Sequence, residues 1–122
     1  MGKHILVVDD DRPLRSFLRE LLESEMYEVD LAADGLDALE KLDYQYHIYD
    51  VILLDMTMPR MNGLQLLREI QQRGLIVFSS IIAISGDVDA LHQATCMGIS
   101  SSLSKPFDSD MLLDLVALSS TS

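Results

Sequence analysis

The chain has little cysteine and no long apolar run, and each shortage excludes a class of protein. Its 122 residues contain one cysteine, Cys96, so no internal disulfide can form, and we expect this side chain to be a small buried hydrophobe. A signal-peptide pattern is also missing, so the expected compartment is a reducing cytoplasm. No apolar run approaches the length of a membrane span, and no membrane association is expected.

Basic residues are also scarce. There are 9 Lys and Arg against 20 Asp and Glu, which gives a formal net charge of −11. A field of that sign argues against general binding to nucleic acids or anionic membranes, and favours cations or a basic partner surface. His4, His47 and His92 lack the spacing of zinc ligands. The length and a hydrophobic content of 48% indicate one globular domain with a single core.

Short apolar runs alternate along the chain with amphipathic segments. The runs expected to be strands are residues 4–8, 27–32, 50–55, 81–84 and, more weakly, 101–104. Between them, apolar residues at helical spacing predict helices after Pro13, Asp34, Asn62 and Asp87 and around Met111. Repeated strand and helix predict one α/β domain with a parallel sheet, right-handed crossovers and helices on both faces.

Polar side chains follow four of the five expected strands. The first run leads into Asp9 and Asp10, and the third, the most apolar of the chain, ends in Asp55. Ser85 and Lys105 follow the fourth and fifth runs. Because the carboxyl ends of parallel strands meet at one edge, where such sheets keep their ligand sites, we expect these side chains to converge. Carboxylates that cluster repel one another, so the cluster is expected to hold a cation.

Four segments resemble, in this order, those of response-regulator receiver domains of two-component signalling. They are residues 5–11, 50–63, 81–85 and 105–107, and the resemblance covers the whole chain. It implies a flavodoxin-like three-layer sandwich, with a doubly wound five-stranded parallel sheet in the order 2-1-3-4-5. Residues 1–118 would form the receiver domain, and the Ser/Thr-rich residues 119–122 a tail that resembles the start of a linker.

The resemblance also implies a role for each residue at this edge. Asp55 would be the phosphorylation site, since a carboxylate can attack a phosphoryl group and hold it as an acyl phosphate. The implied Mg²⁺ ligands are Asp10, Asp55 and the backbone carbonyl of Thr57, with Asp9 acting through water. Such a set suits an ion that takes few protein carboxylates and keeps several waters. Lys105 and the Ser85 hydroxyl would bind the phosphoryl oxygens.

The chain departs from the family pattern at two positions. Three residues before Lys105, where the family usually has a Tyr or Phe that swings inward on phosphorylation, this chain has Ser102. The switch would then depend on Ser85 and Ser102, and we expect its changes to stay close to the site. Met26 stands where a helix-ending glycine is common, and a left-handed backbone there would cost about 1 kcal/mol. The peptide bond before Pro106 is expected to be cis.

The leading interpretation is a receiver that takes a phosphoryl group, with Mg²⁺, from a sensor histidine kinase or a histidine phosphotransfer protein. It would catalyse only its own phosphorylation and dephosphorylation, and would switch conformation to control an output. One alternative is a Mg²⁺-dependent aspartyl-phosphate phosphatase of the haloacid dehalogenase type, but such enzymes need a second acid where this chain has Thr57. Another is an unphosphorylated pseudo-receiver that docks partners. An output domain in a longer parent chain and a homodimer are both left open.

Overall fold

The computed structural model describes residues 3–45, 48–58, 60–74 and 80–119. His47 and residues 120–122 of the expected tail lie outside these ranges. In the described part, strand and helix alternate as the sequence predicts. The elements are β1 (His4–Val8), α1 (Arg12–Ser24), β2 (Glu28–Ala32), α2 (Gly35–Gln45), β3 (Val51–Asp55), α3 (Gly63–Arg73), β4 (Ile81–Ser85), α4 (Val88–Cys96), β5 (Ser101–Ser104) and α5 (Ser109–Ser119).

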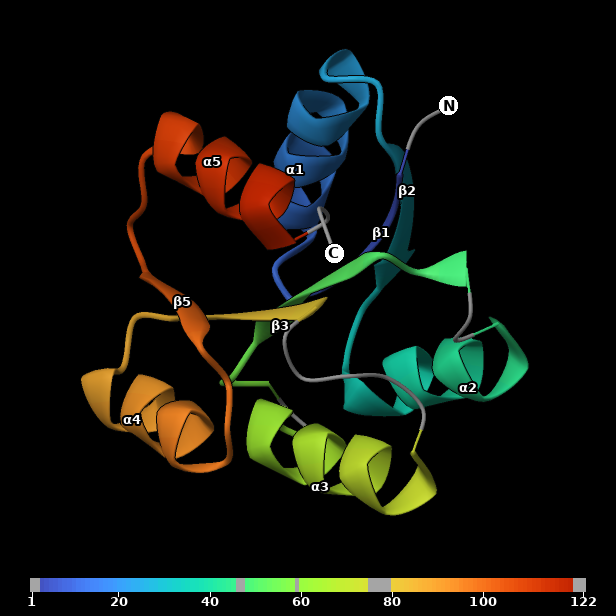
Figure 1. Cartoon of the computed structure of the whole chain (residues 1–122), viewed down its shortest axis with the longest axis vertical. Coiled ribbons are helices and arrows are strands. Elements are labelled where there is room, and N and C mark those ends of the chain that lie inside the picture. The colour runs from blue at the N-terminus through green and yellow to red at the C-terminus, as the bar shows by residue number, and fades with distance from the viewer. Residues whose placement is uncertain (1–2, 46–47, 59, 75–79, 120–122) are drawn as a thin grey trace.

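The strands form one parallel sheet in the order β2-β1-β3-β4-β5, which confirms the expected topology. Helices α1 and α5 cover one face of this sheet, and α2, α3 and α4 cover the other (Figure 1). The central strand β3 is buried along its whole length, because helices lie on both of its faces. That double coverage explains why residues 51–54 are apolar without alternation.

Each face of the sheet has its own apolar core. Along β1, Leu6 and Val8 pack toward α2, α3 and α4, while Ile5 and Val7 pack toward α1 and α5. Successive side chains of a strand point to opposite faces, so one strand supplies both cores. The single core expected from composition is therefore two layers separated by the sheet.

Helix ends follow local signals in the sequence. Asp11 caps α1 by accepting a hydrogen bond from the Leu14 amide (3.3 Å), and Asn62 caps α3 in a reciprocal capping box with Gln65. Met26 has a left-handed backbone, with φ of 70°, as expected. The peptide bond between Lys105 and Pro106 is cis, which was also expected.

The prediction for Cys96 was wrong, because this residue is exposed on α4. The inner face of α4 is marked by Ala94, which is fully buried. At about 100° per residue, a position two places further on points away from the core. A second, smaller difference is that α5 continues to Ser119, the first residue of the expected tail. None of the described helices has the length and apolar character needed to cross a membrane.

Candidate functional site

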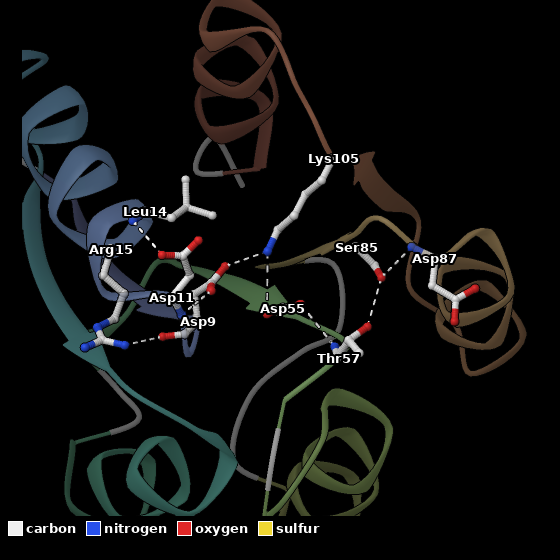
Figure 2. A network of polar contacts seen from close by, with 9 residues as sticks. All are labelled: Asp9, Asp11, Leu14, Arg15, Asp55, Thr57, Ser85, Asp87 and Lys105. Carbon is white, nitrogen blue, oxygen red and sulfur yellow. Dashed lines mark hydrogen bonds and ion pairs between the residues drawn. The ribbon is translucent and has the colours of Figure 1, made fainter.

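The carboxyl ends of four strands bring the expected side chains to one edge of the sheet (Figure 2). Asp9 directly follows β1 and Asp55 is the last residue of β3, with 2% and 3% of their surfaces exposed. Ser85 ends β4 and is equally buried, and Lys105 directly follows β5. The predicted convergence is confirmed for all four.

Three carboxylates gather at this edge. Asp9, Asp10 and Asp55 each offer an oxygen, and these oxygens lie within 4.8 Å of one another. Asp10 is exposed, whereas the other two are buried, so the cluster opens to solvent on one side. Mg²⁺ is a hard cation that binds oxygen ligands and keeps part of its water shell. This set of carboxylate oxygens fits it.

Lys105 pairs with two of these carboxylates. Its Nζ lies 3.0 Å from Asp9 Oδ2 and 3.6 Å from Asp55 Oδ2, and Figure 2 shows it reaching between the two. Burial lowers the pKa of Lys105, but the hydrogen bond and charge of Asp9, together with the charge of Asp55, outweigh it and raise the pKa above its ordinary value. The lysine is therefore firmly charged, and one positive charge faces three carboxylates.

The Asp55 carboxyl has an altered proton affinity. Burial is the largest cause and raises its pKa, and the nearby charge of Asp9 acts in the same direction. The Thr57 amide, which donates to Asp55 Oδ1 at 3.0 Å, and the Lys105 charge lower it. The net result raises the pKa of Asp55 to about 6. At neutral pH most of the carboxyl is still ionised.

Two hydroxyl groups lie beside the carboxylates. Ser85 Oγ accepts a hydrogen bond from the Asp87 amide at 3.0 Å and lies 3.1 Å from Thr57 Oγ1. Thr57 therefore bonds Asp55 through its amide and Ser85 through its hydroxyl, and links the loops after β3 and β4 (Figure 2). Ser102, by contrast, is exposed on the edge strand β5.

The sequence did not predict some of the residues that hold the site and its loops in place. Arg15 of α1 donates from Nη1 to the Asp9 carbonyl at 2.7 Å, and Asp9 Oδ1 accepts from the Asp11 amide at 2.9 Å. The position of Arg15, one helical turn after the Asp11 cap, could have indicated the first contact. Arg60, in the loop after β3, pairs with Asp34 at the start of α2. No local pattern predicts that pair, because 26 positions separate its members.

The sequence model of the response regulator receiver domain matches residues 5–117. The chain belongs to this family. It is 32% identical over 116 residues to sporulation initiation phosphotransferase F of Bacillus subtilis, an alignment that covers 95% of this chain and 92% of that protein. It is 36% identical over 109 residues to a CpxR homolog of Haemophilus influenzae, described as a transcriptional regulatory protein. There the alignment covers 89% of this chain and 46% of the relative, so the receiver spans about half its length.

Solved receiver structures share the fold closely. The chemotaxis response regulator CheY4 of Vibrio cholerae superposes with a TM-score of 0.87 at 27% identity, over 98% of this chain and 99% of that one. The receiver domain of a sensor histidine kinase from Pseudomonas aeruginosa has a TM-score of 0.85 at 28% identity and full coverage of both chains. That structure holds a magnesium ion in its active-site cleft.

Membership assigns the chain a role in two-component signalling as a phosphoryl-accepting receiver, and the phosphatase alternative is not favoured. This role is that of a signalling protein rather than of an enzyme acting on a separate substrate. Receiver domains typically bind Mg²⁺ at an acidic cluster such as this one, and they interact with histidine kinases or phosphotransfer proteins.

Proposed function

We propose that Asp55 accepts the phosphoryl group, from the phosphohistidine of a sensor kinase or phosphotransfer protein. The observation that carries this proposal is the position of its buried carboxylate at the end of β3, with an oxygen within 4.8 Å of oxygens of Asp9 and Asp10 and 3.6 Å from the Lys105 ammonium. Among the three clustered carboxylates, Asp55 is the one that ends the central strand, and burial together with the charge of Asp9 raises its pKa to about 6.

In the proposed reaction an Asp55 oxygen forms a bond to phosphorus while the bond from phosphorus to the donor imidazole nitrogen breaks. The electron pair of that bond returns to the imidazole. Lys105 leaves Asp9 to pair with a phosphoryl oxygen, and the Ser85 hydroxyl donates to another. Attack by water on the acyl phosphate reverses the modification, so the domain would catalyse its own phosphorylation and dephosphorylation and nothing else.

The proposed Mg²⁺ ligands are Asp10, Asp55 and the backbone carbonyl of Thr57, with Asp9 acting through water. A bound ion would supply positive charge against the phosphoryl oxygens. The support is the cluster itself, in which Lys105 alone leaves an excess of negative charge, and the one exposed carboxylate, which allows an ion to keep part of its water shell.

Intact-protein mass spectrometry after incubation with acetyl phosphate and Mg²⁺ tests this function and its alternatives. A receiver gains one phosphoryl mass, a phosphatase releases free phosphate with turnover, and a pseudo-receiver does neither. Asp55→Asn should gain no mass, whereas Glu20→Gln, at an exposed position of α1, should behave like the wild type. Undiminished phosphorylation of Asp55→Asn would overturn the assignment.

The relatives favour two settings for this receiver. It covers nearly all of the Bacillus phosphotransferase but about half of the CpxR homolog, so it would either pass its phosphoryl group on or control an output domain in a longer parent chain. Both settings belong to the cytoplasm, where histidine kinases expose their phosphohistidine. Sedimentation velocity with and without beryllofluoride would show whether phosphorylation also drives a homodimer.

The proposed switch consists of Ser85 and Ser102. The Ser85 hydroxyl, now held by Thr57 and the Asp87 amide, would turn toward the phosphoryl oxygen. Ser102 has no ring to fill the space that this leaves, and its small side chain provides little apolar area to stabilise a distinct inward state. We therefore expect the response to be concentrated in the loops after β3 and β4.

A further inference from the structure

A buried carboxylate outside the acidic cluster ties two segments together. Asp34 lies directly before α2, and 9% of its side chain is exposed. Its Oδ1 accepts a hydrogen bond from the Asp37 amide at 2.9 Å, which caps the helix. Its Oδ2 accepts from Arg60 Nε at 2.7 Å and also contacts Arg60 Nη2. Each oxygen of this carboxylate thus has a separate partner.

The next residue along the chain makes a second tie to the same loop. The Gly35 amide donates to the Met61 carbonyl at 3.2 Å, and a Cβ at Gly35 would lie only 2.5 Å from that oxygen. Arg60 itself has a left-handed backbone, with φ of 64°. A non-glycine residue in that region is strained by about 1 kcal/mol or more, and it persists where the surroundings hold it.

The other end of this loop enters the acidic cluster. Thr57 is three positions before Arg60, and its amide donates to Asp55 Oδ1. The Gly63 amide donates to the Met56 carbonyl at 3.2 Å and closes the loop at its base. The described loop is therefore fixed at the Asp55 carboxylate, at its base and at the start of α2. The loop leads into α3, and α3 lies side by side with α2 (Figure 1).

We propose that the Asp34–Arg60 ion pair positions the loop after β3 so that the Thr57 backbone carbonyl faces the metal site. This inference rests on the proposed function, because it takes that carbonyl to be a Mg²⁺ ligand. Asp34 and Arg60 touch neither the ion nor the phosphoryl group, so they act only through the loop. Residues that orient metal ligands typically change metal affinity by about 10- to 100-fold when they are removed.

An electrostatic role and a positioning role of Arg60 predict opposite changes in Mg²⁺ affinity when this residue is replaced. Arg60→Ala removes a positive charge from the domain, so Coulomb attraction alone would leave Mg²⁺ binding unchanged or tighter. Loss of positioning instead weakens binding, and we expect the Kd to rise about tenfold. Arg60→Lys, which retains the charge and one donor, should recover part of the affinity. Arg73→Ala is the matched control, since Arg73 pairs with Asp43 and Glu69 on the surface of α2 and α3.

Two measurements on the whole domain test the pair. Calorimetric titration gives the Kd for Mg²⁺, and amide hydrogen exchange without metal reports how firmly the Thr57 amide stays on Asp55. Weaker Mg²⁺ binding and faster Thr57 exchange in Arg60→Ala, partly restored by Arg60→Lys and absent in Arg73→Ala, would support the inference. Unchanged or tighter binding in Arg60→Ala would overturn it while leaving the proposed function intact. A wild type without Mg²⁺ binding would overturn both.

Discussion

The two ends of the sheet use polar residues in opposite ways. At the carboxyl end, three carboxylates lie within 4.8 Å of one another and Lys105 pairs with two of them. Near the amino ends of β1 and β3, each carboxylate has its own donor. Asp30 accepts from the Tyr49 hydroxyl at 2.7 Å and lies 3.2 Å from His4 Nε2, and Asp50 accepts from the His4 amide at 2.8 Å.

This difference separates stability from function within one sheet. The amino-end network ties strands together, and the edge-to-face contact of the His4 and Tyr49 rings, 5.2 Å between centroids, adds to it. The carboxyl-end cluster retains an excess of negative charge, which favours the binding of a cation. Removing a polar partner at the amino end should therefore destabilise the protein, whereas neutralising a carboxylate at the carboxyl end should stabilise it.

The largest effect on stability should come from Asp55→Asn. Because the folded-state pKa of Asp55 is raised, from an ordinary 3.8 to about 6, its contribution to stability is fully present below the lower value and is lost as pH rises through the higher one. That rise corresponds to at most about 3 kcal/mol. The variant, which cannot ionise, should be more stable than wild type at pH 7 to 8, with a gap that closes toward pH 4. Urea unfolding across this pH range measures the difference in stability, and the control Glu20→Gln should differ from wild type by the same amount at every pH. If Asp55→Asn were no more stable than wild type at pH 7 to 8, the raised pKa of Asp55 would be contradicted.

Magnesium should relieve the same repulsion. A ligand that binds only the folded state adds about 2.7 kcal/mol at a hundredfold excess over its Kd. Melting of the wild type should therefore rise with millimolar Mg²⁺. Asp10→Asn should melt no lower than wild type without metal and should lose most of the Mg²⁺ response. A clearly lower melting temperature for metal-free Asp10→Asn would show that repulsion between the carboxylates does not destabilise the wild type.

The opposite sign is expected at the amino end. Tyr49→Phe removes the hydrogen bond to Asp30, and we expect a loss of about 1 kcal/mol in the free energy of unfolding. Burial, together with Asp30, raises the pKa of Tyr49, so the hydroxyl remains a neutral donor at pH 7. Urea unfolding at pH 7 measures the loss. A variant as stable as wild type would remove the contrast between the two ends.

The smallest expected effect concerns the output surface. On addition of beryllofluoride, amide chemical shifts should change mainly in residues 56–61 and 86–89, with little change over the rest of α4 and over β5 and α5. Ser102→Tyr, which restores a ring on β5, should enlarge the response there. Equally large shifts across residues 88–118 in wild type, unaltered by the substitution, would show that another element carries the switch.

Much of this architecture could be predicted from the sequence because its signals are local. Apolar runs marked the strands, and parallel strands necessarily bring their ends together, so Asp9, Asp55, Ser85 and Lys105 were found without knowledge of any contact. Contacts between distant segments could not be predicted in this way. Asp34 and Arg60 become partners only because tertiary packing brings the loop after β3 next to the start of α2.

The wrong prediction that Cys96 is buried has a different cause. The type of residue at Cys96 suggested burial, but the rotation of α4 against the sheet decides which positions face inward, and that rotation is set by tertiary packing.

The most direct test of the central claim is to locate the phosphoryl group itself. The domain would be phosphorylated with acetyl phosphate and Mg²⁺, the acyl phosphate reduced with borohydride, and the digested peptides sequenced by mass spectrometry. We predict that the reduced residue is found at position 55, and that omission of Mg²⁺ removes it. A reduced residue at Asp9 or Asp10, or labelling that persists at full yield in Asp55→Asn, would contradict the account.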